Sequence, residues 1–217
     1  MEKKVAVGIP LSWPYCPSDF FFSYAMMEKP VGYQLIRASS GPIDTMRNLI
    51  TRRALELQCT HLIFLDADMV YPYNVITKLL EHDLDIVGAL CFKKGPPFDP
   101  TLLMGEPYKA TTLRDYPEEL IEVTATGTGC LMINLNVMEE IEYPWFEFYK
   151  SPQGKPVGED VGFCYKAKEK GFKIFVDCSL KTEHITLVRV GEDMHRFHRM
   201  AAESGIIKAE QKLFPDF

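Results

Sequence analysis

The chain has 217 residues and a formal net charge of -6, with 47% hydrophobic and 25% charged residues. This composition is that of a folded globular protein, and the length suits one well-cored domain, so we expect a single domain over residues 1–217. The acidic balance excludes a nucleic-acid-binding protein held by bulk positive charge, although a metal ion and a few cations can still attract a phosphorylated ligand into one cleft.

The amino terminus does not resemble an export signal, because its short apolar run is interrupted by Gly8 and Pro10. Nowhere does the sequence approach the roughly 20 consecutive apolar residues that a membrane span needs. We therefore expect a cytoplasmic protein without a membrane span. The six cysteines contain no C-x-x-C pair, which favours buried free thiols over disulfides or a zinc site.

The first half of the chain alternates between strand and helix patterns. The expected strands are residues 3–10, 31–39, 61–70 and 84–92, and the expected helices are residues 43–57 and 72–82, with 20–24 as a short helix or an ordered lid. Pro42 and Asp44 suit the first turn of a helix, and the apolar residues that follow recur at helical spacing. The strand at 61–70 is almost wholly apolar, as expected when both faces of a parallel strand are covered. This order predicts right-handed crossovers and an α/β fold with a mostly parallel sheet.

The second half begins with a connection rich in Pro and Gly over residues 93–116, and a connection of this length is usually functional or mobile. Two strands and a helix start at Asn136 are then expected within residues 120–141. A helix at 158–172, a strand at 173–178, an extended segment at 181–190 and a terminal helix at 191–205 follow. Pairing in this half is expected to be mixed.

Asp66 and Asp68 lie two residues apart where the apolar strand at 61–70 ends. With a period of two, both carboxylates can point to the same side at the carboxyl edge of the sheet, where open α/β sheets bind ligands. Two such anions repel each other by about 1 kcal/mol in water and by more in a cleft, a cost that a divalent cation removes. The alternative is that they cap the helix at 72–82. We favour the metal-binding interpretation.

Around this pair, four motifs occur in order: "MRNLITRRALELQCTHLIFLDADMVYPYNVITKLL", "TGTGCLMINLNVM", "GEDVGFCYKAKEKGF" and "TEHI". Together they resemble the GT-A glycosyltransferases, particularly the family 2-like enzymes, and the resemblance covers Val5 to His184. It implies a GT-A-like (Rossmann-like) α/β/α sandwich. It also implies metal-dependent transfer of a sugar from a nucleoside-diphosphate sugar, such as a UDP- or GDP-sugar, to a hydroxyl acceptor, with a glycan among the candidates.

The resemblance also implies roles for individual residues. Asp68 is similar to a direct ligand of the metal, Mn²⁺ or Mg²⁺, and His184 to the late histidine that completes the site. Asp66 would bind the metal through water or contact the ribose. Asp160 is similar to the base that deprotonates the acceptor, which would invert the anomeric carbon, with Glu159 as its neighbour or substitute.

The same resemblance implies a nucleotide-sugar-binding set. It consists of Pro10, Arg47, Asp66, Ala67, Asp68 and Gly129. Within this set, Arg47 would contact the nucleotide and Pro10 would belong to the base pocket. Two readings remain open for Lys93 and Lys94, which either lie on a solvated loop or close over the donor.

Other functions are also compatible with parts of the sequence. The segment "FLDADMV" fits a haloacid-dehalogenase-like phosphatase with Asp66 as nucleophile, but the next strand, "DIVGALCF", lacks the Ser or Thr that such enzymes usually need. A nucleotidyltransferase would need a Gly-rich basic loop after the first strand, and "GIPLSWPYCP" is not one. A non-catalytic sugar-binding protein on the same scaffold is the remaining alternative, against which the retained acids and histidine argue.

Overall fold

The computed structural model describes residues 3–187 and 191–206 of the chain. The residue contacts divide the chain into two units, Met1–Ile185 and Thr186–Phe217, which are described separately below. The central sheet lies entirely within the first unit. A single domain over residues 1–217 therefore stays a prediction.

A seven-stranded sheet forms the centre of the first unit, in the order β2-β1-β3-β9-β5-β12-β8. The strands are β1 (Val5–Pro10), β2 (Gln34–Ala38), β3 (His61–Leu65), β5 (Ile86–Leu90), β8 (Leu120–Val123), β9 (Cys130–Asn134) and β12 (Ile174–Lys181). Strands β2, β1, β3, β5 and β12 run in one direction, whereas β9 and β8 run in the opposite one. The predicted α/β fold with a mostly parallel sheet is confirmed.

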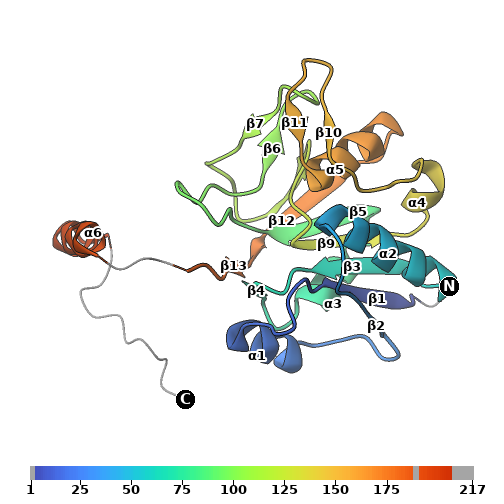
Figure 1. The fold of residues 1–217 in the computed structure, drawn as a ribbon, viewed down its shortest axis with the longest axis horizontal. Helices are drawn as coiled ribbons and strands as arrows, with labels where there is room; N and C mark the ends of the chain where they lie inside the picture. The colour runs from blue at the N-terminus through green and yellow to red at the C-terminus, as the bar shows by residue number, and fades with distance from the viewer. Residues whose placement is uncertain (1–2, 188–190, 207–217) are drawn as a thin grey trace. The chain divides into compact units, whose positions relative to one another are not determined.

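Helices cover both faces of this sheet (Figure 1). They are α1 (Ser18–Met26), α2 (Ile43–Glu56), α3 (Val75–Glu81), α4 (Val137–Glu140) and α5 (Glu159–Glu169). One hydrophobic core contains buried residues of α2, α4 and α5, and a second core contains buried residues of α1 and α3. The unit is thus a three-layer α/β/α sandwich, as expected.

Short two-stranded sheets complete the first unit. They pair β4 (Met69–Val70) with β13 (Glu183–His184), β6 (Leu103–Met104) with β7 (Thr111–Thr112), and β10 (Tyr149–Lys150) with β11 (Pro156–Val157). The strand expected at 61–70 is therefore interrupted at residues 66–68, and the 93–116 connection contains β6 and β7. Of the extended segment expected at 181–190, residues 188–190 lie outside the described residues.

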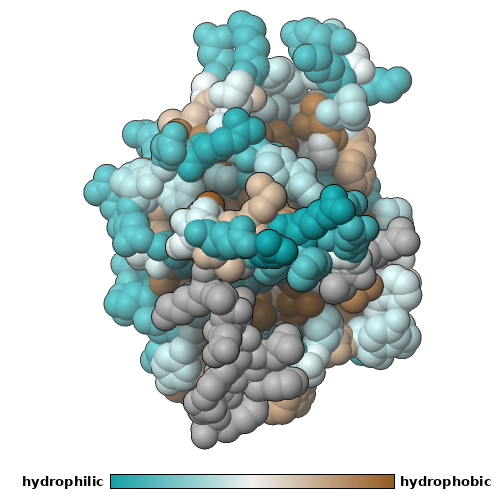
Figure 2. All heavy atoms as spheres, turned by 90° about the vertical axis from the view of Figure 1, so that its left-hand side faces the viewer, coloured by the Kyte–Doolittle hydropathy of each residue, from teal (hydrophilic) through white to brown (hydrophobic). Residues whose placement is uncertain are grey.

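The second unit contains the expected terminal helix, α6 (Glu192–Glu203), on which Arg199 pairs with Glu203 at 2.8 Å. No helix in the described part of the chain combines the length and apolar character that crossing a membrane requires. The face drawn in Figure 2 is mainly hydrophilic, and its hydrophobic side chains lie in small areas between hydrophilic ones. Among the free cysteines, Cys16 is partly exposed and the other five are buried, close to the expectation.

Gly8 in β1 allows helix α2 to pack closely on the sheet. A Cβ atom at this position would lie 2.4 Å from Ile50 Cγ2 and 3.1 Å from Leu62 Cδ1. Ile50 lies on α2 and is fully buried, so neither side has room to yield. The absence of a side chain at Gly8 therefore fixes the depth of α2, the helix that carries Arg47.

We expect Gly8→Ala to lower the free energy of unfolding by about 1–3 kcal/mol, because it overpacks the core between β1 and α2. Urea denaturation followed by circular dichroism measures this change. Gly95→Ala is the control, since a Cβ there meets no atom within 4 Å. Equal stability of the two variants would contradict the proposed packing constraint.

Candidate active site

The acidic turn at Asp66–Asp68 is tied to the glycine-rich segment before β9. The Asp66 amide donates to the Gly129 carbonyl at 3.0 Å. The Tyr71 hydroxyl lies 2.7 Å from the Asp66 carbonyl and 2.9 Å from the Gly129 carbonyl. A Cβ at Gly129 would lie 2.6 Å from Met69 Sδ and 3.5 Å from Asp66 Oδ2. The structure thus brings the predicted residues Gly129 and Asp66 together, and only a glycine fits between Met69 and the acid.

Arg47 joins this turn to the start of α5. Its side chain is only 3% exposed. Nη2 donates to both carboxylate oxygens of Asp66, at 3.0 and 3.2 Å, and Nε donates to Glu159 Oε1 at 3.4 Å. Burial lowers the pKa of Arg47, but Asp66, Glu159 and Asp160 outweigh it and raise the pKa above its usual value. Nη1 is buried and has no hydrogen-bond partner among the described residues.

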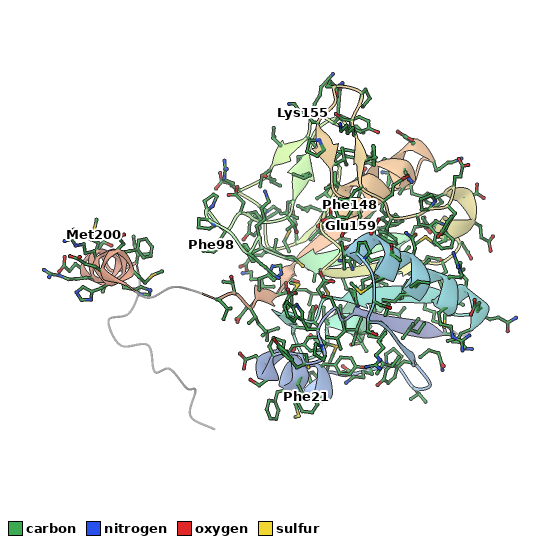
Figure 3. The ribbon with its side chains drawn as sticks, viewed as in Figure 1. Phe21, Phe98, Phe148, Lys155, Glu159 and Met200 are labelled. Atoms are coloured by element: carbon green, nitrogen blue, oxygen red, sulfur yellow. The ribbon has the colours of Figure 1, made fainter. Side chains whose placement is uncertain are left out.

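Glu159 and Asp160 are the first two residues of α5 (Figure 3 labels Glu159). Glu159 is buried against Arg47, whereas Asp160 is partly exposed and accepts a hydrogen bond from the Val161 amide at 2.7 Å. Burial raises the pKa of both carboxyls, and the charge of Asp160 raises that of Glu159 further. A carboxylate with a raised pKa is the better proton acceptor. Asp160 is the more exposed of the two carboxyls, and Glu159 lies against Arg47.

His184 reaches Asp68 through the antiparallel pairing of β13 with β4. The Ile185 amide donates to the Asp68 carbonyl at 2.8 Å, and His184 Nε2 lies 3.5 Å from Asp68 Oδ1. His184 Nδ1 lies 2.5 Å from the Phe92 carbonyl. Because a carbonyl only accepts, Nδ1 must carry a proton, so Nε2 donates to the Asp68 carboxylate when the ring is protonated and offers a lone pair to a cation when the ring is neutral. Burial lowers the pKa of His184, but hydrogen bonds to Asp68 and to the Phe92 carbonyl raise it overall.

Lys94 occupies the other oxygen of Asp68, so that its ammonium contacts Oδ2. Burial raises the pKa of Asp68, but its hydrogen bonds to His184 and Lys94 lower it to about 2. Asp68 is therefore ionised at neutral pH. The ammonium of Lys94 supplies a positive charge at this carboxylate.

Within residues 3–187 and 191–206, no three His, Cys, Asp or Glu side chains are grouped to hold a metal ion. The expected set of Asp66, Asp68 and His184 is thus not assembled, because the Asp66 carboxylate is bonded to Arg47. Asp68 and His184 alone supply a carboxylate oxygen and an imidazole nitrogen. Mg²⁺ commonly takes one or two carboxylates and completes its shell with water and phosphate, and Mn²⁺ also accepts imidazole. The residues present fit a cation that is shared with a phosphorylated ligand.

Two further predicted residues lie at the same edge of the sheet. Pro10 ends β1, is buried, and pairs with Ala38 of β2. Because β1 and β3 are parallel neighbours, Pro10 shares its edge with the acidic turn. Ala67 is partly buried between the two acids. Tyr71 was not predicted as a site residue, because its hydrogen bond to the Gly129 carbonyl joins segments that are far apart in sequence.

No protein-family model matches the chain, and no curated protein matches it in sequence. Several solved structures are similar in fold. A197 from STIV has a TM-score of 0.59 at 19% identity, covering 85% of this chain and 86% of A197. TarS from S. aureus has a TM-score of 0.52 at 15% identity, covering 96% of this chain and 40% of TarS.

GalNAc-T7, solved with UDP, GalNAc and Mn²⁺, has a TM-score of 0.55 at 13% identity, covering 86% of this chain and 44% of that protein. The chain thus spans less than half the length of TarS and of GalNAc-T7. The chain has the GT-A fold, as expected from its motifs. At these sequence identities, the similarity to solved structures shows the fold and does not assign the chain to glycosyltransferase family 2.

Arg47→Met is expected to lower the free energy of unfolding by about 3 kcal/mol or more, because it leaves Asp66 and Glu159 buried without a countercharge. Thermal or urea unfolding measures the loss. Arg53→Met on the same helix is the matched control, since Arg53 forms an exposed pair with Glu56 whose removal should cost under about 1 kcal/mol. Equal losses in the two variants would show that the Arg47 pairs are not needed for the fold.

Proposed function

We propose that this protein is a metal-dependent glycosyltransferase that moves a sugar from a UDP- or GDP-sugar to a hydroxyl acceptor. The observation that carries the proposal is the pairing of β13 with β4, which puts His184 beside Asp68 at the sheet edge. The GT-A fold supports it, as does the presence of UDP and Mn²⁺ in the structure of GalNAc-T7.

Asp68 and Nε2 of His184 would hold the divalent cation, Mn²⁺ or Mg²⁺. When bound, the cation would supply positive charge to the leaving nucleoside diphosphate, the group on which negative charge develops during transfer. The hydrogen bond from His184 Nδ1 to the Phe92 carbonyl orients the ring for this role. These residues suit a cation that also binds phosphate, because together they leave most of its coordination positions open.

Asp66, Arg47 and Gly129 would form the donor side of the site. In this proposal Asp66 contacts the ribose or binds the metal through water, and Arg47 contacts the nucleotide. Gly129 borders Asp66, because a Cβ there would lie 3.5 Å from Asp66 Oδ2. Ala67 would contact the donor between the two acids, and Pro10 would border the base pocket at the same sheet edge.

Asp160 would accept the proton of the acceptor hydroxyl, and in-line attack would then invert the anomeric carbon. Its raised pKa and partial exposure suit this role. Glu159 would position α5 through Arg47. A phosphatase with Asp66 as nucleophile receives less support, because both carboxylate oxygens of Asp66 accept hydrogen bonds from Arg47.

The proposal predicts turnover of at least one UDP- or GDP-sugar, by hydrolysis or transfer, that requires Mn²⁺ or Mg²⁺ and stops with EDTA. Asp68→Asn should lower this turnover by about 100-fold or more, because the cation loses its carboxylate. The exposed acid Asp115 provides a control, Asp115→Asn, which should behave as wild type. Release of phosphate from generic esters without any reaction of nucleotide sugars would instead indicate a phosphatase.

Asp160→Asn is expected to lower transfer by about 100-fold or more while donor binding in the presence of Mn²⁺ stays within about threefold of wild type. Isothermal titration with UDP and a transfer assay separate the two quantities. A normal transfer rate in this variant would remove Asp160 as the base.

A further inference from the structure

Lys94 lies in a small loop formed by residues 93–99. Contacts between the two ends of this loop, here called its base, hold it in place. At the base, Phe92 bridges to Pro100, and the Lys93 amide donates to the Asp99 carbonyl at 2.9 Å. The Asp99 carboxylate also accepts two hydrogen bonds from Arg114, at 2.8 and 3.0 Å. Figure 3 shows Phe98, 50% exposed, at the outer part of this loop. The base therefore holds the loop in place while the side chains of its tip reach into solvent.

From this loop, Lys94 reaches Oδ2 of Asp68, while Oδ1 of the same carboxylate faces Nε2 of His184. The Lys94 side chain is 50% exposed and that of Asp68 is 36% exposed. An ion pair this exposed adds little to stability, so the ammonium can leave without disturbing the fold. Lys94 is also adjacent to Gly95, where no side chain restricts movement.

We propose that Lys94 is a donor-binding residue that exchanges between two anions, the Asp68 carboxylate in the free protein and the diphosphate of the nucleotide in the complex. This inference rests on the proposed function, in which Asp68 and His184 hold a divalent cation. Asp68 cannot bind both positive groups as tightly as it binds either one alone, because an ammonium and a divalent ion on one carboxylate repel each other. Lys94 must therefore withdraw from Asp68 when the cation binds.

The chemistry of the bound ligand decides where the released ammonium goes. A nucleoside diphosphate that shares the cation brings several anionic oxygens to within a short distance of Asp68. A lysine binds phosphate as a compact charge on a flexible stem and needs no fixed fork geometry. Arg114 is already paired with Asp99 at the loop base, so it is less suited to this role. The fixed base keeps Lys94 near the phosphates after it leaves Asp68.

This exchange predicts that one substitution changes the affinity for Mn²⁺ and the affinity for the nucleotide in opposite directions. Lys94→Gln removes the competitor of the cation, so Mn²⁺ alone should bind about three- to fivefold more tightly. The same change removes a charged donor to phosphate, so UDP or GDP in saturating Mn²⁺ should bind about tenfold more weakly. A residue that only supports the local structure would weaken both.

The test uses isothermal titration of the full chain with MnCl₂ alone, and then with UDP and GDP in saturating Mn²⁺. Lys93→Gln is the matched control, because it changes the net charge equally and leaves the pair of Lys94 with Asp68 intact. Lys94→Arg keeps the charge and should retain most of both wild-type affinities. Thermal unfolding confirms that each variant is folded, as expected for exposed positions.

Tighter Mn²⁺ binding together with weaker nucleotide binding in Lys94→Gln, and neither change in Lys93→Gln, supports the exchange. Changes of the same sign, or effects equal to those of Lys93→Gln, overturn it. If wild type binds Mn²⁺ through Asp68, as shown by loss of binding in Asp68→Asn, the proposed function survives such a result. If wild type binds neither Mn²⁺ nor nucleotide, the proposed function and the exchange both fail.

Discussion

The buried charge of Arg47 is the constraint on which the site depends. A guanidinium that is 3% exposed has lost almost all its hydration, and carboxylates must replace it. Asp66 at the end of β3 and Glu159 at the start of α5 supply them. Since Arg47 comes from α2, one side chain fixes three elements relative to each other. The close approach of α2 to β1 at Gly8 sets the depth from which Arg47 reaches them.

The same constraint separates the roles of two acids that are chemically alike. Asp66 is held on the Arg47 side, whereas Asp68 faces His184 and Lys94 on the other. At the start of α5, Glu159 is likewise taken up by Arg47 and Asp160 remains partly exposed. In each pair, one acid accepts hydrogen bonds from Arg47 and the other does not. This division depends on the residues that each acid contacts in the folded chain, because the two acids of each pair have similar neighbours in the sequence.

Much of this arrangement could be predicted from the sequence, because it depends on local patterns. The apolar runs predicted the central strands, and the acidic pair at the end of β3 indicated the sheet edge at which the candidate site lies. His184 was found through the resemblance to GT-A enzymes, and its place beside Asp68 agrees with that expectation. The antiparallel position of β9 between β3 and β5 was not predicted, because strand order depends on contacts between distant segments.

The partners of the charged residues could not be predicted for a related reason. Periodicity places Arg47 on a helix and Lys94 in a loop, but it does not say which carboxylate each will meet. The prediction of one continuous strand over residues 61–70 was also wrong. Strand β3 ends at Leu65, and residues 66–68 separate it from β4, which begins at Met69. Sequence reasoning thus located the candidate site and left its internal pairing to the tertiary structure.

The tight space around Gly129 has a consequence for how this sequence can vary. A methyl group there would collide with Met69 Sδ, and the same position borders Asp66. Related chains that carry alanine in place of Gly129 should therefore carry a smaller residue in place of Met69, so that the two sites change together during divergence. Such paired substitutions in β4 and in the turn before β9 would record the contact in an alignment of relatives.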